Sequence, residues 1–157
     1  GTENLPGIAG FGAAAEAAAA ERDAGAWERT AQVRNILERR LSDAVPELIC
    51  IGRDRPRLPN TACIATPGWK GETQVMQMDL AGFAVSAGSA CSSGKVGASR
   101  VLGAMGFDET VSRSAIRISF GPAATDGEAT AFAEAWLDRW RRFQAKRPEP
   151  HRVREDA

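Results

Sequence analysis

Cys91 lies in the segment SAGSACSSGK, residues 86–95, where almost nothing apolar surrounds it. Its glycine and serine neighbours give the backbone freedom and offer little surface against which a sulfur could pack. Free cysteine usually behaves as a small buried hydrophobe, and we assign that role to Cys50 and Cys63 because both lie in apolar stretches. For Cys91 the sequence instead predicts an accessible thiol on a loop.

A reactive thiol must become a thiolate, which requires a nearby positive charge, a helix N-terminus or a metal. Lys95 is close in sequence, but a lysine in a loop is more often only a solvated charge. The single histidine, His151, lies in a charged, proline-bearing tail, which argues against a Cys–His pair. We therefore expect the group that activates Cys91 to lie outside this chain.

Two other side chains are candidates for binding anions. Alternation in AIRIS, residues 115–119, places Arg117 among small residues, on the strand face opposite to Ile116 and Ile118. Arg117 is then either a surface charge or a clamp that binds a carboxylate through two parallel hydrogen bonds. Thr2, in GTEN, is either a helix cap or part of a phosphate cradle at a helix N-terminus. The pattern alone leaves both questions open.

The elements that position these residues alternate between helices and short strands. Apolar spacing predicts one long helix over 8–41, with a stripe that includes Phe11 and a bend or break at Gly25. Thr125 and Glu128 have capping-box spacing and begin a final helix. Further helices are expected between Gly71 and Gly82 and over 98–105, and strands over 47–51, 61–66, 83–85 and 115–119. The order predicts a two-layer α/β fold with helices packed on a mostly antiparallel sheet.

Length and composition exclude several classes of protein. A chain of 157 residues is long enough for one domain, and its 20 basic residues balance 20 acidic ones, so nucleic acid and anionic membranes are not expected partners. Three cysteines without a CxxC pair fit a reducing compartment, and Glu16 interrupts the longest alanine-rich run. We expect a cytoplasmic protein. Because Gly1 is not an initiator methionine, we also expect a fragment of a larger fold.

Four segments resemble the cysteine desulfurases, which are pyridoxal-phosphate enzymes of the class V aminotransferase family. FAVSAGSACSSG is similar to their active-site loop, in the group whose cysteine lies in a long flexible loop. The other segments are GTENLPGIAGFGAA, LPNTACIATPGWKGE and AIRISFGPAATDGE. The resemblance implies that residues 1–145 are the small C-terminal domain of a fold-type I enzyme without its large domain. The charged, proline-bearing composition of residues 146–157 predicts a disordered tail.

The resemblance also implies a role for each candidate residue. Cys91 would take sulfur from L-cysteine, leaving L-alanine and a persulfide, and would serve as a transient iron–sulfur ligand. Arg117 would hold the substrate carboxylate. Thr2 would reach the cofactor phosphate bound by the other subunit of a homodimer. The persulfide would pass to an iron–sulfur scaffold or to another sulfur-acceptor protein.

The chain departs from the family in its lysines, since Lys70, Lys95 and Lys146 lack the Ser-x-His-Lys context in which members bind their cofactor. We expect a domain outside this sequence to bind most of the pyridoxal phosphate, and the isolated chain to be inactive. Two alternatives stay open: a non-catalytic persulfide carrier or binding module, and a stable domain without activity. The preference between cysteine and selenocysteine is also left open.

Overall fold

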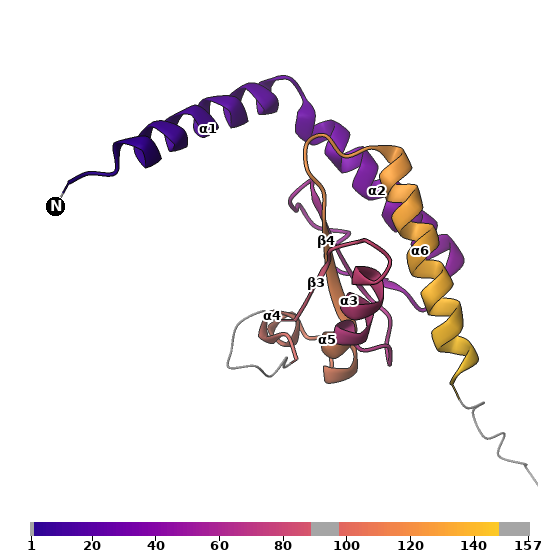
Figure 1. Cartoon of the computed structure of the whole chain (residues 1–157). Helices are drawn as coiled ribbons and strands as arrows, with labels where there is room; N and C mark the ends of the chain where they lie inside the picture. Colours follow the sequence, from indigo (N-terminus) through magenta and orange to yellow (C-terminus); the bar gives the residue numbers. More distant parts are fainter. Residues whose placement is uncertain (1, 89–97, 148–157) are drawn as a thin grey trace, which may run out of the picture.

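A four-stranded antiparallel sheet forms the centre of the structure, a computed structural model that describes residues 2–88 and 98–147 (Figure 1). Strands β2 and β4 are paired along their whole length, and the short strands β1 and β3 flank them in the order β1-β2-β4-β3. The elements are α1 (Leu5–Asp23), α2 (Ala26–Ala44), β1 (Ile49–Cys50), β2 (Thr61–Ala65), α3 (Gly71–Asp79), β3 (Ser86–Ala87), α4 (Arg100–Ala104), α5 (Glu109–Ser114), β4 (Ala115–Ser119) and α6 (Asp126–Ala145). The expected α/β class with an antiparallel sheet is therefore confirmed.

One face of the sheet packs against the long helices. Figure 1 shows α2 and α6 side by side, and their apolar faces cover Ala62, Ile64, Ile116 and Ile118. The largest buried aromatic side chains are Trp69 and Trp136, whose rings lie 5.1 Å apart between centroids. The remaining buried members of this core are Val33, Leu37, Leu41, Val45, Met78, Ala129, Phe132 and Ala133.

The opposite face of the sheet is covered only in part, by the short helices α4 and α5. Leu102 from α4 and Val111 from α5 pack with Ala65 and Ala115 in a second, smaller cluster. Cys63 is packed against this cluster, whereas Arg117 is exposed. The alternation expected for β4 is confirmed, because Ile116 and Ile118 are buried in the main core and Arg117 lies on the other face.

Gly25 divides the long N-terminal helix, as its sequence position predicts. Its φ of 72° is left-handed, a conformation that glycine adopts at no steric cost, and it separates α1 from α2. The expected apolar stripe is wrong for the first half, because Phe11 is 79% exposed and α1 buries no residue. Figure 1 shows α1 projecting away from the sheet. Within the described residues, α1 therefore contributes nothing to the buried core.

Two other local predictions need correction. Residues 83–85 are not a strand, and the third strand is displaced to Ser86–Ala87, where it pairs with β4. The helix α5 was not predicted, because its six residues are too few to show a helical period. Its N-terminus is nevertheless capped in a regular way, since Asp108 accepts a hydrogen bond from the Val111 amide at 2.8 Å.

Gly71, the first residue of α3, lies close to strands β3 and β4. A Cβ added there would lie 2.7 Å from the Ala115 carbonyl oxygen and 3.0 Å from the Ala87 Cβ. Because the backbone of β4 cannot move without disturbing the sheet, we expect Gly71→Ala to lower the free energy of unfolding by about 2 kcal/mol. Chemical denaturation measures this change. The matched variant is Gly103→Ala, in a helix with open space around it, and an equal loss there would contradict the prediction.

Candidate functional site

A row of three polar side chains crosses the partly covered face of the sheet. In the antiparallel register, Arg117 on β4 is opposite both Cys63 on β2 and Ser86 on β3. Directly opposed residues of antiparallel strands project their side chains on the same face, a few ångströms apart. The guanidinium of Arg117 is thus carried by an inner strand, between a thiol and a hydroxyl.

This row borders a pocket of about 420 Å³ between the sheet and α4. The walls combine β-strand residues with the first turn of α4, and Ser99 caps that helix by accepting a hydrogen bond from the Leu102 amide at 3.4 Å. The residues that line it are Cys63, Ser86, Gly88, Ser99, Arg100, Val101, Leu102, Ala115, Ile116 and Arg117.

Both ends of the segment that contains Cys91 lie at this pocket. Gly88 is the last described residue before the segment, and Ser99 is the second described residue after it. Both line the pocket. Cys91 and Lys95 themselves lie outside the described residues, as does His151. The chain therefore leaves this cavity at Gly88 and is at it again at Ser99.

The described lining of the pocket carries positive charge and no negative charge. Arg100 and Arg117 are its only ionisable side chains other than the Cys63 thiol. Within residues 2–88 and 98–147, no ion pair engages either arginine. Such an arrangement suits an anion, and an arginine fork binds a carboxylate through two parallel hydrogen bonds.

The two described cysteines are not poised to act as nucleophiles. Burial raises the pKa of the Cys63 thiol, and the opposing charge of Arg117 offsets only part of this effect. Burial likewise raises the pKa of Cys50, against a hydrogen bond with Ser42 that lowers it. Because the thiolate is the reactive form, both side chains stay neutral and unreactive near pH 7. Their expected role as structural cysteines agrees with this environment.

Thr2 lies apart from this pocket. It is exposed, it precedes α1, and it is not among the residues that line the cavity. The cap of α1 is Asn4, whose side chain accepts a hydrogen bond from the Gly7 amide at 3.1 Å, so the alternative that Thr2 caps this helix is wrong. The structure therefore brings Arg117 to the ends of the Cys91 segment and does not bring Thr2 there.

Sequence patterns missed three polar residues of the pocket, namely Ser86, Ser99 and Arg100. Ser86 was missed because the third strand was expected over residues 83–85 and not at Ser86–Ala87. Ser99 carried a signal that could have been used, since a serine directly before a helix is a typical cap. For Arg100 the pattern gave no signal, because nothing in the sequence says which side of so short a helix faces a pocket.

A pyridoxal ring needs an amine for its covalent attachment and an acidic partner for its ring nitrogen. The described lining of the Arg117 pocket contains neither a lysine nor a carboxylate. Lys70 borders a separate pocket, beside Glu109 and Arg113. The described residues thus fit an anionic group such as a carboxylate, and they do not by themselves form a site for the cofactor. They also contain no cluster of metal-ligating side chains.

The sequence and the fold of this chain have counterparts among known proteins. The family model for class-V aminotransferases matches residues 1–132, and the chain belongs to this family. The cysteine desulfurase of Cereibacter sphaeroides is 41% identical over 134 residues, which are 85% of this chain and 34% of the relative. The cysteine desulfurase of Gluconacetobacter diazotrophicus is 41% identical over 128 residues, or 82% of this chain and 32% of that protein.

A solved structure with a similar fold supports the same family. The NifS-like protein from Rickettsia africae superposes with a TM-score of 0.76 at 30% identity, over 90% of this chain and 36% of its own. The chain thus spans about a third of the length of the proteins that it matches. In the described part of the chain, no helix has the length and apolar character needed to cross a membrane.

Proposed function

We propose that this chain forms the substrate-binding and sulfur-accepting part of a pyridoxal-phosphate-dependent cysteine desulfurase. The class V family and the similarity to named cysteine desulfurases support this function. The observation that carries it is that Gly88 and Ser99, which lie on either side of residues 89–97 in the sequence, both line the Arg117 pocket. A nucleophile and a carboxylate-binding group are what sulfur removal from an amino acid requires of the protein.

Chain length supports a thiol within reach of this pocket. Cys91 is three residues beyond Gly88, and an extended chain advances by at most about 3.6 Å per residue, so the two Cα atoms are separated by no more than about 11 Å. A thiol tethered at this distance can approach a substrate held by Arg117. The glycine and serine content of the tether lowers the steric cost of such an approach.

In the proposed reaction, Arg117 binds the carboxylate of L-cysteine and so orients its side chain. The Cys91 thiolate attacks the substrate sulfur, an S–S bond forms, and the Cβ–S bond breaks with its electron pair on carbon. Protonation of that carbon yields L-alanine, and the protein retains a persulfide. Pyridoxal phosphate, when bound, would supply the electron sink that this cleavage needs.

The proposal extends to the partners of the full protein. A persulfide on Cys91 would be handed to an iron–sulfur scaffold or another acceptor protein in the cytoplasm, with Cys91 as a transient ligand of the cluster. Thr2 would contact the cofactor phosphate bound by the second subunit of a homodimer, and its exposed position leaves it accessible for this contact. A larger cofactor-binding domain would precede residues 1–145 in the complete protein.

The test is to incubate the native gene product with pyridoxal phosphate and L-cysteine. We expect the visible absorbance of bound cofactor, formation of L-alanine, and a mass increase of one sulfur atom that maps to Cys91. Protein that gains sulfur only from an added persulfide donor, without binding cofactor or forming alanine, would establish the carrier alternative. The carrier alternative is supported by the described lining of the Arg117 pocket, which contains no lysine amine to bind the cofactor.

A further inference from the structure

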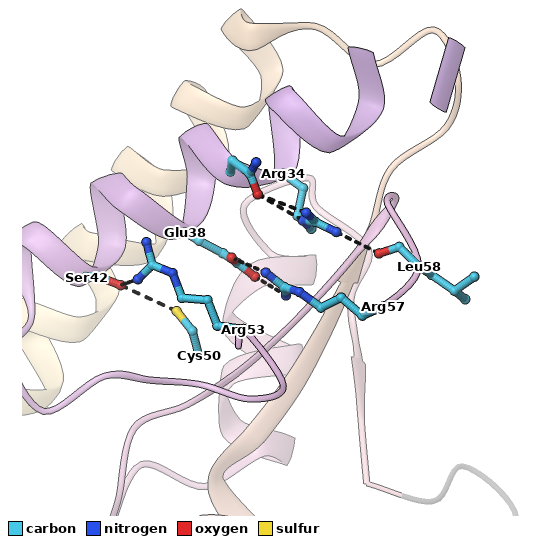
Figure 2. Close-up of polar contacts among 8 residues, drawn as sticks. Arg34, Glu38, Ser42, Cys50, Arg53, Arg57 and Leu58 are labelled. Atoms are coloured by element: carbon cyan, nitrogen blue, oxygen red, sulfur yellow. Dashed lines mark hydrogen bonds and ion pairs between the residues drawn. The ribbon is translucent and has the colours of Figure 1, made fainter. Parts of the chain in front are cut away.

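A second pocket, of about 420 Å³, lies between α2 and the loop that joins β1 to β2. It shares no residue with the Arg117 pocket. Figure 2 shows several of its side chains, with guanidinium groups from the helix and from the loop lying near one another. The lining consists of five arginines and one asparagine: Arg34, Asn35, Arg39, Arg53, Arg55 and Arg57.

Within the described part of the chain, one of these arginines forms an ion pair. Glu38 is 2% exposed, and its carboxylate accepts two hydrogen bonds from Arg57, at 2.5 and 2.6 Å (Figure 2). Among the described residues, no ion pair within 4.0 Å engages the other four arginines of the pocket. The pocket therefore carries a local excess of positive charge in a chain whose formal net charge is zero.

Arg34 is the most informative of these residues, because it is buried and only 8% exposed. Its guanidinium donates to neutral acceptors, the Leu58 carbonyl at 2.7 Å and the Asn35 side-chain oxygen at 2.9 Å (Figure 2). Burial and the nearby charge of Arg57 lower the pKa of Arg34, and the charge of Glu38 offsets only part of this effect. A buried guanidinium whose charge is only partly balanced is costly, and an anion bound beside it would reduce that cost.

We propose that the arginine pocket formed by α2 and the β1–β2 loop binds a phosphate group, as inorganic phosphate or as a small phosphate monoester. Arginine forks match phosphate oxygens in pairs, and several forks around one cavity satisfy a dianion from different directions. The charges surround a single compact cavity, which favours a small dianion over an extended acidic peptide. This site is independent of the proposed desulfurase activity.

The test compares two variants that each remove two positive charges. Arg39→Gln with Arg55→Gln removes exposed arginines of the pocket, while the buried Arg34 and the Glu38–Arg57 pair stay intact. The matched control, Arg40→Gln with Arg141→Gln, removes exposed arginines that do not line it. Titration calorimetry of inorganic phosphate, at constant ionic strength with chloride as the balancing salt, gives the dissociation constant.

We expect the pocket variant to bind phosphate about tenfold or more weakly for each guanidinium removed, and the control variant to bind like the parent protein. Glycerol phosphate measured in parallel distinguishes the sources: tighter binding than inorganic phosphate assigns the site to a monoester, and equal binding assigns it to the free ion. Absence of phosphate binding by the parent protein would overturn the proposal. So would equal weakening in both variants, or binding of hexaglutamate in place of phosphate.

Discussion

Replacing Cys91 with alanine in the complete protein is expected to abolish persulfide formation and to lower L-alanine production by about a thousandfold or more, because the sulfur has no nucleophile to attack it. The measurement is L-alanine release under saturating L-cysteine, with intact mass reporting the bound sulfur. Cofactor absorbance should be unchanged, since in the proposed reaction Cys91 would accept sulfur and would not hold the ring. This pattern separates the loss of a nucleophile from the loss of the fold.

The chain provides a matched control for this variant in Cys50. Burial raises the pKa of its thiol, so Cys50→Ala removes a neutral sulfur and should leave alanine production unchanged. In the Cys91→Ala protein, the remaining thiols should react with a thiol reagent at pH 7 far more slowly than free cysteine does. A Cys91→Ala protein that still accumulates persulfide would contradict the assigned role, and sulfur mapped to Cys63 would reassign it.

The second large effect is expected from Arg117→Gln, which should lower kcat/KM for L-cysteine by about a hundredfold to a thousandfold. In the proposed reaction the lost interaction is a pair of charge-assisted hydrogen bonds to the carboxylate, each of which would contribute about 1.5–2 kcal/mol. Arg117→Lys should recover only part of this loss, because an ammonium cannot form the two parallel bonds. Steady-state kinetics at varied L-cysteine concentration measures the change and separates KM from kcat.

Cysteamine, which is cysteine without its carboxylate, tests the proposed contact between Arg117 and the carboxylate by changing the substrate and not the protein. The parent protein should prefer L-cysteine strongly, while the Arg117→Gln protein should discriminate little between the two compounds. Arg113→Gln is the charge-matched control, since its exposed pair with Glu109, at 2.7 Å, contributes little to stability. If Arg117→Gln kept its preference for L-cysteine, Arg117 would not be the carboxylate-binding group.

Much of the fold follows from signals that are local in the sequence. Thr125 and Glu128 form both bonds of the expected capping box, and α6 begins at the next residue, Asp126. The alternation in β4 identified its core face. Patterns failed where long-range packing decides the outcome: Phe11 has helical spacing like the residues of α2, yet no partner for α1 lies within the described residues. Helical spacing of apolar residues does not show whether another element packs on the face that they form.

The candidate site was predictable only in part. Arg117 was identified from residue type and context, whereas Ser86, Ser99 and Arg100 were missed. The position of Arg117 beside Ser86 depends on β3 pairing with β4 across a long stretch of sequence. The arginine pocket was not predicted, although Arg53, Arg55 and Arg57 alternate in the segment GRDRPR, because the sequence does not show that this loop packs beside α2. In a chain of balanced charge, such a local excess is found only once the elements are placed.

The alternation of β4 also restricts how this protein can change during evolution. Ile116 and Ile118 are buried in the core, while Arg117 between them borders the pocket. Successive positions of β4 therefore alternate between the core and the proposed binding site. Inserting or deleting one residue within the strand would shift its register and exchange the two faces. Arg117 would then enter the apolar core and an isoleucine would replace it at the pocket. We therefore expect β4 to tolerate substitutions at exposed positions far better than the insertion or deletion of one residue.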